Sequence, residues 1–545
     1  MKIHAFFLLI IFILSCLPSF SQDSTVYQLG PAESSSLFET TLEYLGTYEG
    51  QYVTLQRKGN LQEAFSYSLI TTDIQTLERV DRKNINLSPS FYQGMISTQK
   101  GTYLYFRPKQ EEATTQAYVL DYETLTLQKS DAPVETLVLA NAQSDFSSQS
   151  SSIRFPTAYN NIPFPQSIEH IQYPAQTGQL LATTKHPLYP NVYNPIIPEK
   201  AQVLTADQTK YRLAFIATKK KEPNIIQLVK EEREEMEQTT FDIPVEGYFL
   251  FNPIIFENSD RHLVCTGYFS ETKHKPKFQT PKSGIFHITI DPANGQILQR
   301  SFFNFSLAQV LRFISEDEYK AQKDKADTYR TALSLELGIT NMYMSRIIQR
   351  ADGGYTIIHE QHRSKKVVPL PGLTRLASGD ADPMSRTNLE QNREYTSYDI
   401  LLTTVSADGN LLWEQTIPRR SMFYNYSESW SGYALGFDGE NLHFIFNDHV
   451  DNQDLMDSEE EEFYSTLDLN KNLSTVHVTI GADGQMEQNT LALRGEIEVD
   501  FRVNRFFQPD SQTLIIEGTS RPEDALFNLY QKSYTTQYIR IPLSR

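Results

Sequence analysis

The chain has 545 residues and a formal net charge of −18, from 67 acidic and 49 basic side chains. This excess of acidic groups argues against a nucleic-acid partner, because phosphates are bound mainly by Lys and Arg. The 30 Tyr and 32 Phe residues are typical of a chain in which many strands cross a packed face.

The first residues predict a secretory signal peptide. Lys2 supplies the positive start, residues 5–14 form an apolar core, and Ser19 and Ser21 frame a small-x-small cleavage site. The apolar core has about ten residues, whereas a membrane-spanning helix needs ~20. We therefore expect residues 1–21 to be removed and no transmembrane segment to remain. The protein is expected to be exported and to be periplasmic, associated with the outer membrane or extracellular.

The two cysteines have different expected roles. A lipid anchor on Cys16 is the alternative to cleavage after Ser21, although a leucine stands where a lipobox usually has a small residue. After cleavage only Cys265 is left, so no intrachain disulfide can form. Cys265 lies in the apolar run 262–268, which predicts a small buried core residue rather than a catalytic thiol. The fold must then be stabilised by burial alone.

The strand pattern begins soon after the signal peptide. Residues 22–40 are Ser-rich and weakly patterned, which predicts a flexible lead-in. From there on, short runs of alternating apolar and polar residues are separated by turns. We expect residues 41–545 to form a single domain.

Asp-Gly turns provide the strongest local signal. Residues 345–418 contain two successive hairpins, with turns at Asp352-Gly353 and Asp408-Gly409. Glycine accepts the positive φ that such turns require, so these pairs predict tight hairpins. Two hairpins in succession make a four-stranded antiparallel unit, which is the shape of one β-propeller blade. Similar outer hairpins recur at residues 284–298 and 475–486.

The spacing of these units predicts an all-β fold, a β-propeller of four-stranded antiparallel blades. Clear units lie near residues 45–80, 92–130, 245–300, 343–418, 430–490 and 497–543. Residues 150–240 are Ser-rich and Pro-rich, but the strand-like runs 178–183 and 211–217 predict at least one more unit. Seven blades are favoured, and six and eight remain open. Closing the sheets into a ring removes most exposed edges.

Two insertions interrupt the pattern. Residues 306–338 are predicted to be helical, because Ser306 with Gln309 and Ser315 with Glu318 form two capping boxes before apolar residues at helical spacing. Residues 363–396 are polar and marked by Pro and Gly, which predicts a loop insertion rather than core.

The central part of the chain resembles a family of secreted propeller-like proteins of Gram-negative bacteria. The residues that carry the resemblance are GYFSETKHK, KSGIFHITIDPANGQIL, RADGGYTIIHEQ, YDILLTTVSADGNLLWEQTIPRR and GYALGFDGENLHFIFNDH, within residues 248–449. The resemblance implies the propeller fold and an envelope or extracellular location. It implies no catalytic residue, because no activity is established for the family.

The sequence His359-Glu360-Gln361-His362 resembles a metal-binding motif but has the wrong spacing. Metalloproteases need two His residues four apart on a helix. Here the spacing is three and the flanking residues predict a strand, so alternation places the two rings on opposite faces. No metal site is predicted there.

Carboxylates concentrate near residues 447–462, where Asp448, Asp451 and Asp454 form a weak candidate for calcium. Calcium favours oxygen-rich loops, yet the EF-hand spacing and its glycine are missing. We expect a solvated acidic loop, and we predict no cofactor.

Aromatic residues gather beside two arginines in the stretch 419–433. Such a cluster can stack on sugar rings or anchor a protein partner, although packing between blades is the commoner role of buried aromatics. The candidate ligand-binding residues are Arg419, Arg420, Tyr424, Tyr426 and Trp430.

The sequence favours a binding or scaffold propeller that engages a protein or glycan partner through loops at one mouth of the ring. Nucleophile elbows, phosphate-binding loops and dinucleotide fingerprints are missing from the sequence. The alternative is a propeller-type enzyme that acts on polysaccharide or another extracellular substrate, with carboxylates or His near the central channel.

Overall fold

The computed structural model describes most of residues 27–543. The residues it leaves undescribed within this span are 37–38, 59–64, 88–89, 99–100, 109–115, 131–177, 184–201, 205–208, 217–224, 232–237, 244–247, 259, 271–280, 315–318, 325–337, 341, 351, 367–392, 420, 425–431, 439–440, 453–472, 494–498 and 521–532.

The described strands form seven antiparallel sheets, which we number as blades 1 to 7 in chain order. Blades 1 and 2 are β3 (Glu39–Tyr48), β4 (Gln51–Lys58), β5 (Ser66–Asp73) and β6 (Arg79–Ile85), then β7 (Ser90–Thr98), β8 (Gly101–Pro108), β9 (Gln116–Asp121) and β10 (Thr126–Lys129). Blades 3 and 4 are β12 (Gln202–Leu204), β13 (Lys210–Ile216), β14 (Ile225–Glu231) and β15 (Gln238–Ile243), then β16 (Phe249–Glu257), β17 (Leu263–Ser270), β18 (Gly284–Ile290) and β19 (Ile297–Asn304).

The last three blades have the same four-stranded plan, with additions to blades 5 and 7. Blade 5 is β20 (Met342–Arg350), β21 (Tyr355–Lys366), β22 (Arg393–Val405) and β23 (Leu411–Ile417), with β11 (Gly178–Thr183) on β20 and β24 (Ser421–Tyr424) on β22. Blade 6 is β25 (Ala434–Phe437), β26 (Leu442–His449), β27 (Leu473–Ile480) and β28 (Met486–Leu493). Blade 7 is β29 (Asp500–Asp510), β30 (Thr513–Ser520) and β31 (Ser533–Pro542), with β1 (Gln28–Leu29) and β2 (Glu33–Ser36) on β31.

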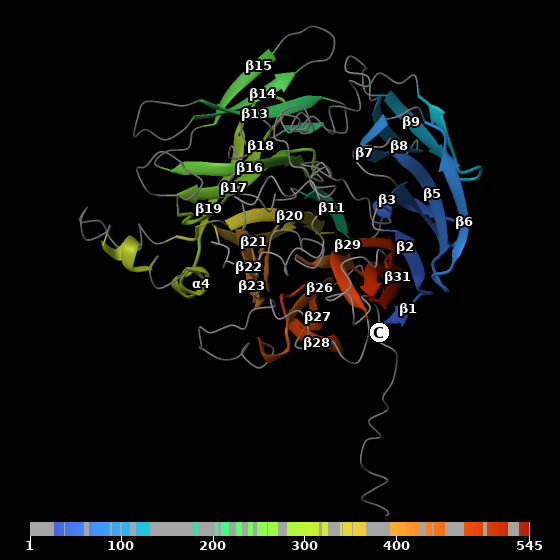
Figure 1. Ribbon diagram of the computed structural model, residues 1–545. Helices are drawn as coiled ribbons and strands as arrows, with labels where there is room; N and C mark the ends of the chain where they lie inside the picture. Colours follow the sequence, from blue (N-terminus) through green and yellow to red (C-terminus); the bar gives the residue numbers. More distant parts are fainter. Residues whose placement is uncertain are drawn as a thin grey trace, which may run out of the picture.

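The blades are arranged as a propeller, with α4 (Leu307–Phe313) on the outside near β19 and β23 (Figure 1). β29 contacts both β25 of blade 6 and β3 of blade 1, which brings the first and last blades together. Clusters of buried apolar side chains join blades 1 and 2, 3 and 4, 4 and 5, 5 and 6, 6 and 7, and 7 and 1. The predicted all-β propeller fold and the favoured number of seven blades are therefore confirmed for the described residues.

The Asp-Gly turns behave as predicted. Gly353 and Gly409 have φ values of 83° and 64°, in the left-handed region that favours glycine. In blade 5 these turns join β20 to β21 and β22 to β23, so they lie at one end of the sheet. The other end, where β21 leads toward β22, carries the additions described below.

Two stretches have partners that sequence reasoning did not anticipate. β11, expected within an additional unit, pairs with β20 and so belongs to blade 5 (Figure 1). β1 and β2 lie in the predicted lead-in, residues 22–40, and pair with β31 near the C-terminus. Blade 7 is thus built from both ends of the described chain.

The predicted helical insertion begins with α4. The predicted capping box is present, because Gln309 N donates to Ser306 Oγ at 3.2 Å and Ser306 N donates to Gln309 Oε1 at 2.7 Å. Val310 and Phe313 of α4 are buried in the cluster between blades 4 and 5. Residues 319–324 are also helical, and the second predicted capping box lies outside the described residues.

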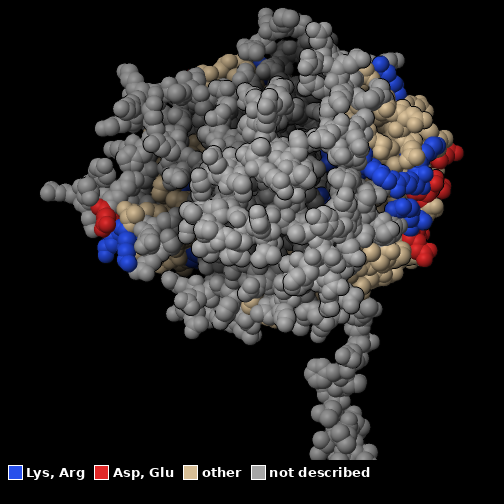
Figure 2. Space-filling model, viewed as in Figure 1, with Lys and Arg blue, Asp and Glu red and all other residues tan. Residues whose placement is uncertain are grey.

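Buried and exposed groups follow the expected pattern. Cys265 is buried, as predicted. None of the helices in the described part of the chain has the length and apolar character needed to span a bilayer. Positive and negative side chains alternate over the N-terminal sheet in Figure 2, where β6 exposes Arg79, Asp81, Arg82 and Lys83. Mixed charges on such an outer strand discourage edge-to-edge pairing with another chain.

Candidate functional site

Two of the five predicted ligand-binding residues, Arg419 and Tyr424, are described, and they lie near one end of blade 5. Arg419 lies between β23 and β24, and Tyr424 ends β24. Arg420, Tyr426 and Trp430 lie outside the described residues. The structure thus describes the side chain of Arg419 and only the backbone of Tyr424.

Arg419 is fully buried rather than displayed at the surface. Its Nη2 donates to Glu360 Oε2 at 3.2 Å and forms an ion pair with it. Its backbone N donates to Asp399 Oδ1 at 2.9 Å. The guanidinium carbon also lies 5.9 Å from the centre of the Tyr433 ring. A buried arginine is tolerated when a carboxylate matches its charge, as Glu360 does here, so Arg419 is an internal anchor.

Two carboxylates of blade 5, Asp399 and Glu414, tie α4 to this blade. Asp399 also accepts a hydrogen bond from Arg312 Nε of α4. Gln309 Nε2, on the same helix, donates to Glu414 Oε2 at 2.8 Å. Burial raises the pKa of Glu414, because an ionised carboxylate is disfavoured away from water. Polar contacts therefore hold the helix against β22 and β23.

A three-stranded ribbon extends blade 5 beyond Arg419. Five residue pairs, from His362 with Ser397 to Lys366 with Arg393, continue the hairpin of β21 and β22. β23 stops at Ile417, and β24 then pairs with the same extension of β22. At a rise of ~3.3 Å per residue the ribbon is roughly 17 Å long. The ends of the predicted insertion, residues 363–396, are therefore strands.

Residues 359–362 lie on β21, as predicted. His359 is buried, and its Nδ1 lies 2.8 Å from Tyr268 Oη of blade 4. Its Nε2 lies 3.2 Å from Thr403 Oγ1. Burial lowers the pKa of His359 to about 3, so the ring is neutral at physiological pH. The ring links two blades and has no ring nitrogen free for a metal.

A second His–Tyr pair joins the same two blades, but here the His lies on blade 4 and the Tyr on blade 5. His287 of blade 4 has Nδ1 2.6 Å from Tyr355 Oη of blade 5 and Nε2 2.9 Å from Thr289 Oγ1. Burial lowers its pKa to about 4. The joint between blades 4 and 5 thus contains two neutral imidazoles whose ring nitrogens are all hydrogen-bonded.

The candidate calcium residues are only partly described. Asp448 is buried, and its Oδ1 accepts hydrogen bonds from His449 N at 2.8 Å and Asn452 Nδ2 at 2.6 Å. Asp454 and the side chain of Asp451 lie outside the described residues. Among the residues that are described, no three potential metal ligands gather in a group that could hold an ion.

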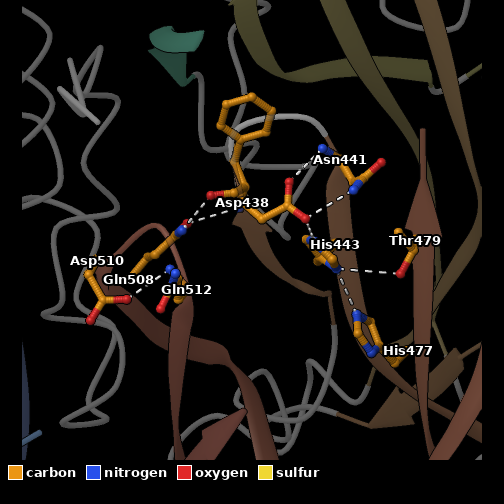
Figure 3. Close-up of polar contacts among 9 residues, drawn as sticks. Asp438, Asn441, His443, His477, Thr479, Gln508, Asp510 and Gln512 are labelled. Atoms are coloured by element: carbon orange, nitrogen blue, oxygen red, sulfur yellow. Dashed lines mark hydrogen bonds and ion pairs between the residues drawn. The ribbon is translucent and has the colours of Figure 1, made fainter. Parts of the chain in front are cut away.

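Blade 6 contains a polar chain that sequence reasoning missed (Figure 3). Asp438 Oδ2 lies 3.1 Å from His443 Nε2, and His443 Nδ1 lies 3.0 Å from His477 Nε2. Asn441 donates to Asp438 through both its backbone N, at 2.7 Å, and its Nδ2, at 3.0 Å. Desolvation lowers the pKa of His443, and Asp438 partly opposes this effect.

Asp438, His443 and His477 follow one another as the groups of an acid–base relay do (Figure 3), but the two His rings are not exposed to solvent. His443 is buried, as is His477. Asp438 holds the proton on His443 Nε2, which leaves Nδ1 to accept a hydrogen bond from His477. Gln508 joins the start of this chain to blade 7, because its side-chain amide makes hydrogen bonds with both Phe437 N and Phe437 O. This series of hydrogen bonds therefore connects strands of blades 6 and 7 and does not face a substrate.

No protein-family model and no curated protein matches this chain. Among solved structures, it is similar to a protein of unknown function from Dyadobacter fermentans, with 6% identity, a TM-score of 0.26 and coverage of 93% of this chain and 99% of the other. It is also similar to oligogalacturonate lyase in complex with manganese, with 9% identity, a TM-score of 0.30 and coverage of 95% and 98%. A putative 6-phosphogluconolactonase from Bacteroides fragilis has 9% identity, a TM-score of 0.28 and coverage of 88% and 93%. Likenesses this distant say nothing about activity, and the propeller assignment rests on the sheets themselves.

Proposed function

We propose that this protein is a binding propeller of the cell envelope or the extracellular space, and that it engages a protein partner through the blade 5 ribbon. The observation that carries the proposal is the ribbon itself, formed by residues 362–366, residues 393–397 and β24. It continues past the point where β23 ends, and the buried Arg419 cluster anchors its base.

The strand edges of the ribbon favour a protein over a glycan. In the described part of the chain, residues 362–366 pair with β22 on one side only, and β24 likewise pairs only with β22. A strand edge presents backbone N–H and C=O groups that another extended segment can pair with. A partner that adds a strand would use these backbone groups.

Four of the five buried histidines in the described part of the chain favour binding over catalysis. The rings of His287, His359, His443 and His477 are all buried and hydrogen-bonded to internal partners. The Cys265 thiol is also buried, and desolvation raises its pKa. A general base or nucleophile must reach the substrate, and none of these groups does.

The test compares the wild type with a variant whose ribbon is shortened. Replacing residues 365–394 by Asn-Gly would close the hairpin after the pairing of Ser364 with Tyr395. Each protein is incubated with an envelope fraction and with a glycan array. We expect the wild type to retain a protein that the shortened variant loses, with unchanged thermal stability. The matched control is Arg82→Ser with Lys83→Ser on the exposed strand β6, which should retain the same protein.

Two results would contradict the proposal. Equal retention by the wild type and the shortened variant would exclude the outer end of the ribbon, residues 365–366 and 393–394, and binding to glycans alone would exclude a protein partner. A parallel screen on polysaccharides and ester substrates addresses the enzymatic alternative. Turnover of any of these substrates by the wild type would favour that alternative.

A further inference from the structure

β11 is an additional strand on the inner edge of blade 5. Its residues, Gly178–Thr183, belong to the connection between β10 of blade 2 and β12 of blade 3, yet they pair with β20, the first strand of blade 5. In Figure 1, β11 lies inside the ring of sheets, beside β20. Within the described ranges, the first strands of the other six blades each end their sheets. Blade 5 therefore differs from them in carrying a further strand toward the centre of the ring.

The edge of β20 that β11 covers is short and is limited at both ends. The residue pairs with β11 run along β20 from Arg346 to Arg350. Directly before Arg346, Ser345 is left out of the register between β20 and β21, which marks a β-bulge. Directly after Arg350 the chain turns back, and Arg350 N donates to Gly354 O at 2.8 Å. A bulge and a turn both interrupt a ladder, so residues 346–350 form a strand-binding edge of five residues.

β11 can leave this edge without the unfolding of a blade. Residues 130–177 and 184–201 separate it from β10 and β12, and β20 would keep its pairing with β21. The register of β11 also shifts between Leu180 and Ala182, so its ladder with β20 is interrupted. In the described part of the chain, β11 pairs on one side only. Such a short strand is held weakly, because few backbone hydrogen bonds offset the entropy lost when it is ordered.

We propose that β11 is a releasable strap, and that residues 346–350 of β20 bind an extended segment of a partner protein once β11 leaves. This edge already accepts an extended segment that comes from a different part of the ring. Any extended chain can make the backbone hydrogen bonds of a ladder, so a partner segment can replace residues 178–183. The site lies on the inner edge of blade 5, apart from the ribbon, and it goes beyond the proposed function.

The test measures the binding of a labelled synthetic peptide of residues 176–185 to the full-length mature protein by fluorescence anisotropy. Gln179→Pro with Leu180→Pro in the protein should release the strap. Successive N–H groups of a strand point to opposite edges, so one of the two prolines must remove a ladder donor. We expect the peptide to bind this variant at least tenfold more tightly than the wild type, in which the intramolecular copy has the higher effective concentration. Ser147→Pro with Ser148→Pro, in the same connection but outside β11, is the matched control and should bind as the wild type does.

A cross-link tests the same edge without releasing the strap. Gln179 and Gln349 are directly opposite each other, so Gln179→Cys with Gln349→Cys should form a disulfide on mild oxidation. Gln179→Cys with Arg346→Cys is the control. These positions are about 10 Å apart along the ladder, which is too far for a disulfide. The native Cys265 is buried and should not compete.

Circular dichroism and thermal unfolding establish that the proline variant is folded, and the cross-link does not depend on that variant. Equal binding of the peptide to the proline variant and the wild type would overturn the proposal, as would failure of the Gln179–Gln349 cross-link to form. A peptide that carries the same two prolines should not bind, and equal binding of this peptide would overturn the strand-pairing mode. None of these results depends on whether the ribbon binds a partner.

Discussion

Two joints of the ring are built from different polar chemistry. The joint between blades 4 and 5 uses neutral groups, the His359–Tyr268 and His287–Tyr355 pairs. The joint between blades 7 and 1 uses charges. Glu517 of β30 lies 2.6 Å from Arg502 Nη1 and 3.6 Å from Arg505 Nη1, and Arg505 also donates to Thr41 O of β3.

The difference matters because each joint becomes vulnerable under its own conditions. A neutral His–Tyr pair needs an unprotonated imidazole, so acid weakens it below the usual pKa of His. For Glu517, burial alone would raise the pKa, but Arg505 and Arg502 together lower it. That joint therefore keeps its charge until the pH falls below the usual pKa of Glu. The joint between blades 7 and 1 also contains the stacked rings of Tyr44 and Phe507, whose centres are 4.4 Å apart.

The largest effect is expected from breaking the charged joint on one side only. Glu517→Ala would leave the half-buried Arg502 and Arg505 without their buried carboxylate, and breaking a buried pair on one side typically costs about 3–5 kcal/mol. Urea denaturation at pH 7 should show this loss. The triple variant Arg502→Met, Arg505→Met and Glu517→Leu should recover much of it, because all three charges are then removed together. A single variant within ~1 kcal/mol of the wild type would show that water reaches this pair.

The pH dependence of stability should show that His287 and His359, at the joint between blades 4 and 5, are neutral in the folded protein. The folded pKa of His287 is about 4 and that of His359 about 3, below the unfolded value of 6.5. The unfolded chain therefore binds more protons between pH 6.5 and pH 4. Stability is fully present above pH 6.5 and falls as the pH drops through this window, by about 3 kcal/mol for each His.

The measurement is a series of urea titrations from pH 7 to pH 4.5. His359→Gln should be less stable than the wild type at pH 7 but should lose less stability on acidification. Glu517→Gln should leave the slope between pH 6.5 and 5 unchanged. An unchanged slope in His359→Gln would contradict the assignment of a neutral, buried ring.

A smaller effect is expected from removing one hydroxyl of the neutral joint. Tyr268→Phe would leave His359 Nδ1 buried without its partner, at a cost of about 1–3 kcal/mol. Tyr268→Phe combined with His359→Leu should cost less than the sum of the two single changes, because the pair is then removed together. Additive effects in urea denaturation would indicate that the two side chains are not coupled.

The hairpins were predictable because their information is local. Asp352-Gly353 and Asp408-Gly409 define turns of a few residues, and the register of the flanking strands follows from them. The capping box at Ser306 is local in the same way. Each of these features depends on residues within four positions of one another.

The contacts that define the candidate sites could not be predicted, because they depend on long-range register. His443 and His477 come together only when β26 pairs with β27, and about twenty residues separate these strands. Arg419 was predicted to be a ligand-binding residue because it adjoins an aromatic run. Its partners Glu360 and Asp399 lie on other strands, so nothing near Arg419 in the chain reveals its burial.

The smallest predicted effect concerns the helix that covers the neutral joint. Ser306→Ala would remove the hydroxyl that accepts from Gln309 N, at a cost of about 1 kcal/mol. Because Val310 and Phe313 pack into the cluster between blades 4 and 5, loosening α4 should also raise hydrogen exchange at that joint. The joint between blades 7 and 1 should exchange as in the wild type, and Ser66→Ala on blade 1 is the matched control. Increased exchange at both joints would show that the ring opens as one cooperative unit, and that the two joints differ in chemistry but not in local stability.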